Sequence, residues 1–217
     1  MKGPHPELVK MVAEQIESRG VHDERVLEAM RSVPRWEFVP QEMRGSATED
    51  RPLPIGNGQT ISQPYIVALM TELLHLQGDE NILEVGTGSG YQAAILSRLA
   101  SQVNTVEFIP SLAIDAQERL TRLGYPNVHV HQGDGSVGLV DFSPYDGILV
   151  TAACPSAPPA LLDQLAEGGR LVMPIGGRWR QELQCWQKQG TTFESEDILP
   201  VAFVPLRGTQ GWKESEW

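Results

Sequence analysis

One ten-residue run constrains the fold of this chain more than any other segment: residues 82–91 read ILEVGTGSGY. Its first four residues predict a short buried strand, and the three alternate glycines predict a tight turn after it. We expect a helix to begin at Tyr91. Glycine has no Cβ, so a turn of this kind lets backbone N–H groups approach a ligand closely. The run therefore predicts a strand–turn–helix unit with a ligand site at the turn.

The spacing of the three glycines discriminates between cofactors. A dinucleotide fingerprint is G-x-G-x-x-G, but here the glycines are Gly86, Gly88 and Gly90, and Tyr91 occupies the third dinucleotide position. The pattern E-x-G-x-G-x-G, with Glu84 inside the strand, resembles the first motif of Rossmann-like S-adenosylmethionine (AdoMet) methyltransferases. A carboxylate there suits a sulfonium cation, or an ammonium group through water. The same carboxylate would repel a pyrophosphate.

Strands and helices alternate after the glycine turn. Apolar runs predict further strands at 103–107, 128–132, 147–150 and 170–174, with helices near 91–100, 111–123 and 159–165. This alternation is typical of βαβ units and a parallel sheet. Three later runs, 183–187, 192–196 and 202–205, have no helices between them and predict antiparallel strands. The expected fold is α/β: a doubly wound, Rossmann-like, mostly parallel sheet with antiparallel C-terminal strands and an N-terminal helical extension.

The N-terminal part predicts helices at 5–19 and around 26–30, the second ending near Pro34. Residues 33–59 are rich in proline and glycine, yet their apolar side chains indicate an ordered, packed loop. A helix follows over 64–76 and is ended by Gly78. We expect one methyltransferase domain over 1–217, with a helical cap and active-site loop in 1–60 and the Rossmann-like core in 61–217.

Two acidic residues follow strands at the edge where a doubly wound sheet binds ligands. Glu107 ends the second strand of the alternation, where its carboxylate could accept hydrogen bonds from both ribose hydroxyls. An acid in that place is also the NAD pattern, so Glu107 alone does not separate the cofactors. Asp134, between Gly133 and Gly135, follows the third strand and could accept from an adenine amino group. Alternatively, Asp134 is an ordinary turn residue with no role in ligand binding.

Composition excludes several classes of protein. A net charge of −11 over 217 residues argues against a nucleic-acid partner, because such proteins present a basic face. No apolar run approaches the ~20 residues of a membrane span. The polar N-terminus lacks a signal-peptide core, so we expect a cytoplasmic location. Cys154, Cys185 and the five histidines show no metal-ligand spacing, so neither a metal site nor a disulfide is predicted.

The segment 51–65, RPLPIGNGQTISQPY, is the second informative feature. By local chemistry alone Ser62 is a helix N-cap, with Pro64 in the first turn of the helix. The segment also resembles the signature of protein-L-isoaspartate O-methyltransferases. The likeness covers roughly residues 24–206 and is carried by the segments 84–91, 105–107, 133–135, 145–146, 150–153, 168–172 and 203–206.

The resemblance implies a cofactor, AdoMet, and roles for individual residues. The serine at the position of Ser62 is the active-site residue of the family, and Gln59, Thr60 and Ile61 line its cofactor and substrate cleft. Glu107 matches the ribose acid, and Asp134 with Gly135 matches the adenine contact. Two places depart from the family pattern. Asn57 stands where many members carry an aromatic or other bulky residue, and 207–210 matches only loosely.

The reaction implied is methyl transfer to the α-carboxyl group of L-isoaspartyl residues in damaged proteins and peptides. The product ester is expected to collapse to a succinimide, which begins repair. An acceptor carboxylate with a pKa of roughly 3.5–4 is already ionised at neutral pH, so no general base is needed. We expect Ser62 to orient it by a hydrogen bond, and we expect a monomer with no nucleic-acid or membrane partner.

Three alternatives use the same or a related fold. Amino-methylating adenine enzymes carry an Asp/Asn-Pro-Pro-Tyr loop after the fourth strand, and cytosine C5 enzymes carry Pro-Cys; here residues 151–155 read TAACP. Acidic charge counts against both kinds of nucleic-acid methyltransferase. A binding protein that has lost catalysis is disfavoured by the complete set of candidate residues. A nicotinamide dehydrogenase is disfavoured by Tyr91 and Glu84.

Overall fold

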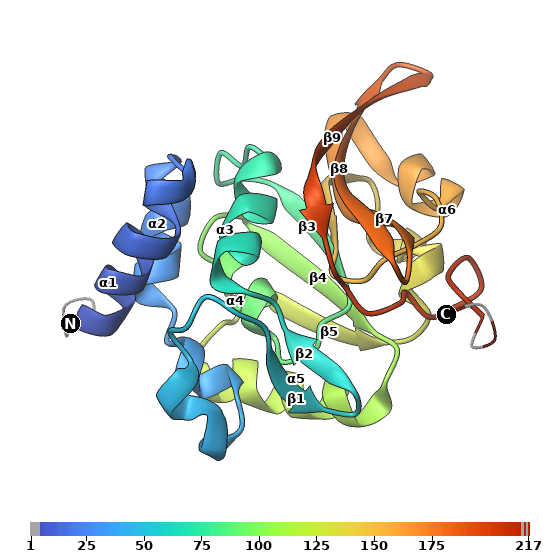
Figure 1. The fold of residues 1–217 in the computed structure, drawn as a ribbon. Coiled ribbons are helices and arrows are strands. Elements are labelled where there is room, and N and C mark those ends of the chain that lie inside the picture. The colour runs from blue at the N-terminus through green and yellow to red at the C-terminus, as the bar shows by residue number, and fades with distance from the viewer. Residues whose placement is uncertain (1–4, 214, 216) are drawn as a thin grey trace.

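The computed structural model describes residues 5–213, 215 and 217, and its centre is a seven-stranded sheet of order β5-β4-β3-β6-β7-β8-β9 (Figure 1). The five strands from β5 to β7 are parallel, and β8 and β9 are antiparallel additions at one edge. The predicted fold class is therefore confirmed. The strands are β3 (Asn81–Val85), β4 (Gln102–Glu107), β5 (Val128–Gln132), β6 (Tyr145–Val150), β7 (Leu165–Gly177), β8 (Arg180–Gln189) and β9 (Thr192–Val201).

The order of the strands positions the site. From β3 the chain moves outward to β4 and β5, then returns to place β6 on the other side of β3. The carboxyl end of β3 is therefore the switch point, where a crevice opens between diverging connections. β3 is buried on both faces, since Leu83, Glu84 and Val85 are all inaccessible to solvent or nearly so. The glycine turn begins at this end of β3.

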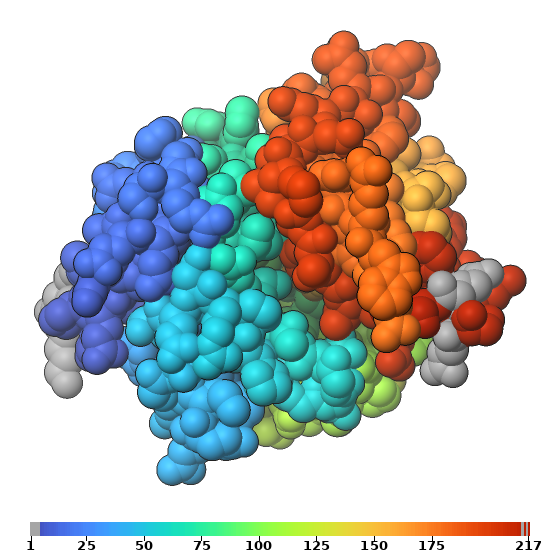
Figure 2. All heavy atoms as spheres, viewed as in Figure 1, coloured from blue at the N-terminus to red at the C-terminus, as the bar shows by residue number. Residues whose placement is uncertain are grey.

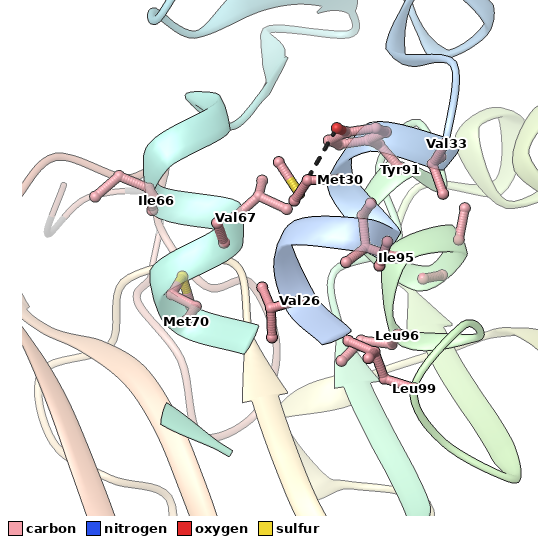
Figure 3. Packing of buried hydrophobic residues seen from close by; sticks show 14 of the residues in the cluster. Val26, Met30, Val33, Ile66, Val67, Met70, Tyr91, Ile95, Leu96 and Leu99 are labelled. Atoms are coloured by element: carbon pink, nitrogen blue, oxygen red, sulfur yellow. Dashed lines mark hydrogen bonds between the residues drawn. The ribbon is translucent and has the colours of Figure 1, made fainter. Parts of the chain in front are cut away.

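Helices cover the sheet, and the N-terminal helices add to its hydrophobic core. The helices are α1 (Pro6–Gln15), α2 (Glu24–Ser32), α3 (Pro64–Leu73), α4 (Tyr91–Leu96), α5 (Pro110–Leu123) and α6 (Pro159–Asp163). Figure 3 shows α2 inserting Val26 and Met30 between α3 and α4, and the Tyr91 hydroxyl lies 3.9 Å from Met30 Sδ. The N-terminal helices thus share one hydrophobic core with α3 and α4. None of the helices in the described part of the chain is long and apolar enough to cross a bilayer.

Four predicted helices are shorter in the structure than expected. The helix predicted over 5–19 ends at Gln15, and the one predicted near 159–165 ends at Asp163. The helix predicted to run to residue 76 ends at Leu73, and His75 beyond it has a left-handed φ of 55°. The helix expected over 91–100 ends at Leu96, and turns follow it. Short 3-10 helices occupy other connections: η1 (Glu17–Arg19), η2 (Arg35–Phe38), η3 (Gln41–Ser46), η4 (Gly135–Val137) and η5 (Val140–Phe142).

A second, two-stranded sheet was not predicted. Strands β1 (Leu53–Gly56) and β2 (Gln59–Ile61) form an antiparallel hairpin inside the segment expected to be an irregular loop. Asn57 and Gly58 form its tip with φ values of 52° and 70°. Positive φ at both central residues is the geometry of a type I′ turn, which Asn-Gly favours. Asn57 is therefore the first central residue of this turn.

The strand predicted at 202–205 does not form. The sheet ends with β9 at Val201, and Phe203 is instead held by the side chain of Gln181, which accepts from Phe203 N at 2.7 Å. The chain then crosses toward the end of β6, where Ala153 N donates to Val204 O and Leu206 N donates to Ala153 O, both at 2.8 Å. This extended crossing segment becomes one wall of the site.

Candidate active site

The glycine turn lies directly beneath the crevice at the end of β3. Gly86 has a φ of 95°, and a Cβ on it would lie 2.3 Å from Thr151 Oγ1. Only glycine fits there, because both the backbone conformation and the neighbouring hydroxyl exclude a side chain. Thr151 donates from Oγ1 to Gly86 O at 2.7 Å, which ties the turn to the end of β6. The turn is thus open on its ligand side and fixed on the other.

Glu107 joins the glycine turn to the end of β4. Its Oε2 accepts from Gly88 N at 2.8 Å and its Oε1 from Ile109 N at 2.9 Å. Each carboxylate oxygen has two acceptor positions, so one position on each oxygen is left for a ligand. The side chain is buried and lines the crevice together with Gly88. This arrangement fits the predicted acceptance of two ribose hydroxyls.

Glu84 is a carboxyl group fully enclosed beneath the turn, with 0% of the residue exposed. Its Oε2 accepts from Thr105 Oγ1 at 2.5 Å, and Thr105 Oγ1 is 2.6 Å from Thr87 Oγ1. Its Oε1 has no hydrogen-bond partner in the described chain. Burial raises the pKa of Glu84 to about 8; the Thr105 hydrogen bond opposes this shift and the charge of Glu107 adds to it. An enclosed carboxyl with a spare oxygen suits a cationic ligand group.

Three hollows meet above the turn and share two residues, Thr60 and Thr151. We call the first the glycine-turn chamber; its lining includes Gln59, Thr60, Gly86, Gly88, Glu107, Gly135 and Val204–Arg207. We call the second the inner chamber; its lining includes Thr60, Ile61, Ser62, Glu84, Gly86, Tyr91 and Gln92. We call the third the open cleft; it is lined by Pro52, Thr60, Ser62, Gln63, Ile66, Thr151 and Pro200–Val204.

The open cleft has a volume of about 390 Å³, within the range of small-ligand sites. Figure 2 shows the surface hollowed between the cyan hairpin β1–β2 and the red end of the sheet at β9. The glycine-turn chamber therefore reaches inward to the glycine turn, and the open cleft faces solvent. Thr60 and Thr151 line both hollows and lie where the two meet. The geometry suits two substrates that approach each other from opposite sides.

Ser62 lies between the open cleft and the inner chamber and is half-buried. It does not cap α3: the N-cap position is Gln63, and the amide of Tyr65 donates to Asp50 Oδ1 at 3.2 Å. Asp50 also accepts from Gln63 Nε2 at 2.5 Å and pairs with Arg19 at 2.7 Å. The Ser62 hydroxyl makes no hydrogen bond to the described part of the chain. The interpretation of Ser62 as an N-cap is wrong, because Asp50 serves the first turn of α3 instead.

Asp134 has the geometry of its second interpretation, a turn aspartate, and is the N-cap residue of η4. Its Oδ1 accepts from Ser136 N and Oγ at 2.9 and 2.6 Å, and its Oδ2 accepts from Thr209 N and Oγ1, both at 2.7 Å. Burial alone would raise the pKa of Asp134, but these hydrogen bonds hold it below its usual value. Four donors fill the acceptor positions of a carboxylate, so this conformation leaves none for an adenine amino group. Its neighbour Gly135 does line the glycine-turn chamber.

Gly90 also lies outside the three hollows. It is the N-cap residue of α4, with a φ of 86°, and a Cβ there would lie 3.2 Å from the Leu120 side chain. It therefore serves close packing against α5. The structure brings the other predicted cofactor residues to the hollows: Gln59, Thr60, Gly86, Gly88, Glu107 and Gly135 in the glycine-turn chamber, and Ile61 and Glu84 in the inner chamber.

Several lining residues were missed from the sequence. Thr151 directly follows β6, so the rule that ligands bind at strand ends could have identified it. Phe108 and Ile109 follow Glu107 and line the glycine-turn chamber, for which the same rule holds. No local signal marks Asp50 as a site residue. The segment 203–206 was noted only for its family likeness, and its place in the lining depends on contacts far apart in the chain. Among the described residues, no group of three or more His, Cys, Asp and Glu side chains is arranged to hold a metal ion.

Comparison with known proteins agrees with this geometry. A family model described as protein-L-isoaspartate(D-aspartate) O-methyltransferase matches residues 7–211. The chain is 54% identical over 204 residues to protein-L-isoaspartate O-methyltransferase 1 of Syntrophobacter fumaroxidans, covering 94% of this chain and 95% of the relative. It is 51% identical over 216 residues to the protein-L-isoaspartate O-methyltransferase of Methanoregula boonei, covering 98% of this chain and 100% of that relative.

Solved structures agree as well. A protein-L-isoaspartate O-methyltransferase superposes with a TM-score of 0.85 at 31% identity, over 94% of this chain and 66% of that longer chain. A β-aspartate methyltransferase of Plasmodium falciparum, solved in complex with S-adenosyl-L-homocysteine, superposes with a TM-score of 0.78 at 23% identity, over 95% and 99%. At that identity the second likeness concerns the fold alone. By the family match and the close relatives, the chain belongs to the protein-L-isoaspartate O-methyltransferase family.

Proposed function

We propose that this protein transfers the methyl group of AdoMet to the α-carboxyl group of L-isoaspartyl residues in damaged proteins and peptides. Family membership supports the reaction. The observation that carries it in this chain is the place of Ser62. Its hydroxyl, which has no hydrogen-bond partner among the described residues, lies in the wall shared by a solvent-open cleft and a chamber that reaches the glycine turn. A donor at that junction can orient an acceptor carboxylate toward the cofactor.

The residues of the glycine-turn and inner chambers fit AdoMet. Glu107 has spare acceptor positions for ribose hydroxyls, and Gly86 leaves room for close approach to the backbone. The enclosed oxygen of Glu84 would balance positive charge on the cofactor, directly or through water. AdoMet bound there supplies an electrophilic methyl group on a sulfonium cation. We propose Gln59, Thr60, Ile61 and Gly135 as further cofactor contacts, through their places in the lining.

The acceptor side requires positioning more than acid–base chemistry. A carboxylate with a pKa of roughly 3.5–4 is ionised at neutral pH, so it is already a nucleophile. Ser62 donates one hydrogen bond that orients it for an in-line displacement, and Thr60 and Thr151 narrow the junction and exclude water. A single donor is appropriate, since charge on the attacking oxygen falls in the transition state and strong binding would slow the reaction. The resulting methyl ester closes to a succinimide without further catalysis.

We further propose that the partners of this protein are isoaspartyl-containing polypeptides, with no nucleic-acid or membrane partner. The net charge of −11 supports this, because it repels phosphate backbones and anionic lipid. A monomeric state, a cytoplasmic location and one catalytic unit over 1–217, with 1–60 as cap and active-site loop, are part of the same proposal. The core shared by α2, α3 and α4 supports the single unit.

The test is methyl transfer from labelled AdoMet to a synthetic peptide with one L-isoaspartate, beside the same peptide with normal aspartate. We expect base-labile label on the isoaspartyl peptide alone, since base lability distinguishes an ester from an N-methyl group. AdoMet binding by calorimetry is measured in parallel. Binding without label on either peptide would leave the cofactor assignment in place and overturn the assignment of the acceptor.

A further inference from the structure

We propose that the β7–β8 turn, Gly177–Arg180, docks acidic residues that flank the isoaspartyl residue of a polypeptide substrate. The proposal rests on the function above and adds a preference for particular substrates. Its starting point is Trp179, which is 91% exposed, far more than any other large hydrophobic residue described. An indole so exposed contributes little to the folded core and is available for contact with a partner, where Trp is enriched.

The turn displays its side chains and leaves them accessible. Gly177 pairs with Arg180 across the hairpin, so Arg178 and Trp179 form a two-residue tip. The guanidinium carbon of Arg178 lies 5.3 Å from the centroid of the Trp179 ring. Stacking of this kind orders both side chains while the outer N–H groups of the guanidinium stay available for a carboxylate. The side chain of Arg180 is 88% exposed, and its one ion-pair contact in the described chain is Glu182 at 3.9 Å.

The turn stands at the edge of the sheet that holds the open cleft. β7 runs parallel to β3 and β6, so its carboxyl end lies at the same edge as the glycine turn. The next residue after the turn, Gln181, accepts from Phe203 N at 2.7 Å and donates to Phe203 O at 3.1 Å. Phe203 is a wall residue of the cleft that contains Ser62. Two hydrogen bonds therefore fix the base of the turn to the wall of the cleft.

The link through Gln181 and Phe203 leads us to infer that the turn lies within reach of a bound peptide. An extended chain advances about 3.3 Å per residue, so residues a few positions from an isoaspartate held at Ser62 extend past the wall of the cleft. In Figure 2 orange atoms of this region stand on the rim of the hollow, opposite the cyan hairpin β1–β2. The occupant is thus a neighbouring part of the substrate already bound in the cleft.

Charge identifies the kind of occupant. The chain carries 28 acidic and 17 basic residues, so most of its surface repels an acidic peptide. Arg178 and Arg180 place two positive charges beside the cleft, and Arg178 has no ion pair within the described residues. A carboxylate that approaches the cleft is attracted to this turn. Peptides with Asp or Glu near the isoaspartate therefore gain an attraction that lysine-flanked peptides lack, and Trp179 adds apolar contact for either kind.

The experiment uses three isoaspartyl peptides that differ only in residues two to four positions from the isoaspartate, which are Glu, Ala or Lys. Initial rates give kcat and KM for wild type, for Arg178→Ala/Arg180→Ala and for Trp179→Ala. We expect the double variant to raise KM for the Glu peptide roughly three- to tenfold, the range for two exposed charge pairs, with kcat unchanged and little effect on the Ala peptide. Trp179→Ala should raise KM for all three peptides. The Glu preference of wild type should disappear near 1 M salt, where screening acts within about 3 Å.

A matched control is Arg98→Ala, which removes one exposed arginine from the chain after α4, away from the cleft. It should leave the ratio of KM values between the Glu and Lys peptides unchanged. The docking proposal is overturned if the double variant keeps the wild-type ratio, or if it raises KM equally for Glu and Lys peptides. Failure of wild type to methylate even the Ala peptide would instead overturn the proposed function. All substituted residues are exposed, and thermal unfolding verifies that the variants fold.

Discussion

Replacing Glu84 with glutamine tests the electrostatics of the inner chamber. Glu84 is fully buried, its Oε1 has no partner in the described chain, and burial raises its pKa to about 8. At pH 7 the carboxyl is therefore mostly protonated in the empty enzyme. A cationic cofactor beside it favours the carboxylate, so binding should expel the proton. Glutamine keeps the shape of the side chain but has no proton to lose.

The size of the effect follows from the pKa. A group with a pKa of about 8 is roughly 90% protonated at pH 7, so AdoMet binding should release about 0.9 proton from this site. The affinity of wild type for AdoMet should rise about tenfold between pH 7 and pH 9. At pH 7 the Glu84 carboxyl must lose its proton before it can pair with the cofactor, whereas at pH 9 it is already ionised. In Glu84→Gln this part of the pH dependence should vanish.

The same pKa has a consequence for stability, with a definite sign. The folded protein binds more protons than the unfolded chain between about pH 4.5, the ordinary value, and about pH 8. Its free energy of unfolding therefore falls as pH rises through this window, by about 1.4 kcal/mol per pH unit from this group. Glu84→Gln should lack this loss. The difference in free energy of unfolding between the variant and wild type should therefore shift in favour of the variant by on the order of 3–6 kcal/mol between pH 4.5 and 8.5.

Calorimetric titration with AdoMet in two buffers of different ionisation enthalpy measures the protons released. The amino group of the ligand titrates near pH 8 as well, so the quantity of interest is the difference between wild type and Glu84→Gln. Urea unfolding at pH 5 and pH 8.5 measures stability. Equal proton release by the two proteins, with parallel stability profiles, would refute the view that Glu84 is protonated in the empty enzyme.

Three further substitutions test the walls of the site. Ser62→Ala should lower kcat at least tenfold in the peptide assay, and calorimetry should find a Kd for AdoMet within about twofold of the wild-type value. The reason is that the lost hydrogen-bond donor contacts only the acceptor carboxylate. Full activity would show that the hydroxyl has no part in positioning. Gly86→Ala should prevent measurable AdoMet binding and lower the free energy of unfolding by roughly 2–3 kcal/mol, because its Cβ would collide with Thr151. The control Gly58→Ala meets open space and should cost only about 1 kcal/mol in the same urea titration; equal costs would contradict the collision. Asp50→Asn should lower the free energy of unfolding by about 1–3 kcal/mol, because Asp50 holds the first turn of α3. It should also lower kcat, because that turn lies next to Ser62. A destabilised variant with wild-type kcat would show that Asp50 stabilises the fold without positioning Ser62.

The central sheet could be predicted because its information is local. Each of β3 to β6 is a run of apolar residues bounded by turn residues, and the alternation with helices implies parallel pairing. The hairpin β1–β2 was missed because β2 has only three residues, too few to display a period. Its signal was nonetheless present: Asn57-Gly58 between short extended segments is a strong hairpin mark.

The errors at the site have a different cause. Residues 202–205 have the pattern of a strand, but the backbone groups of Phe203 bond to the side chain of Gln181 and not to a neighbouring strand. The cap of α3 comes from Asp50, which lies well before the helix in the chain. The acceptor positions of Asp134 are filled by Ser136 and Thr209. For Phe203 and for α3 the deciding partner lies too far away in the chain for a local pattern to reveal. The same holds for Thr209 at Asp134, whereas Ser136 is only two residues from Asp134.

The cleft is built from opposite ends of the chain, and this has a consequence for the order of folding. One wall, Pro52 to Gln63, precedes every strand of the main sheet, and the other, Pro200 to Val204, comprises the end of β9 and the residues that follow it. Contacts between residues so distant in sequence form late, because closing a long loop loses entropy before any contact compensates for it. A nascent or partly unfolded chain can therefore hold helices and parallel strands without an acceptor cleft. During refolding, methyl-transfer activity would be the last native property to return.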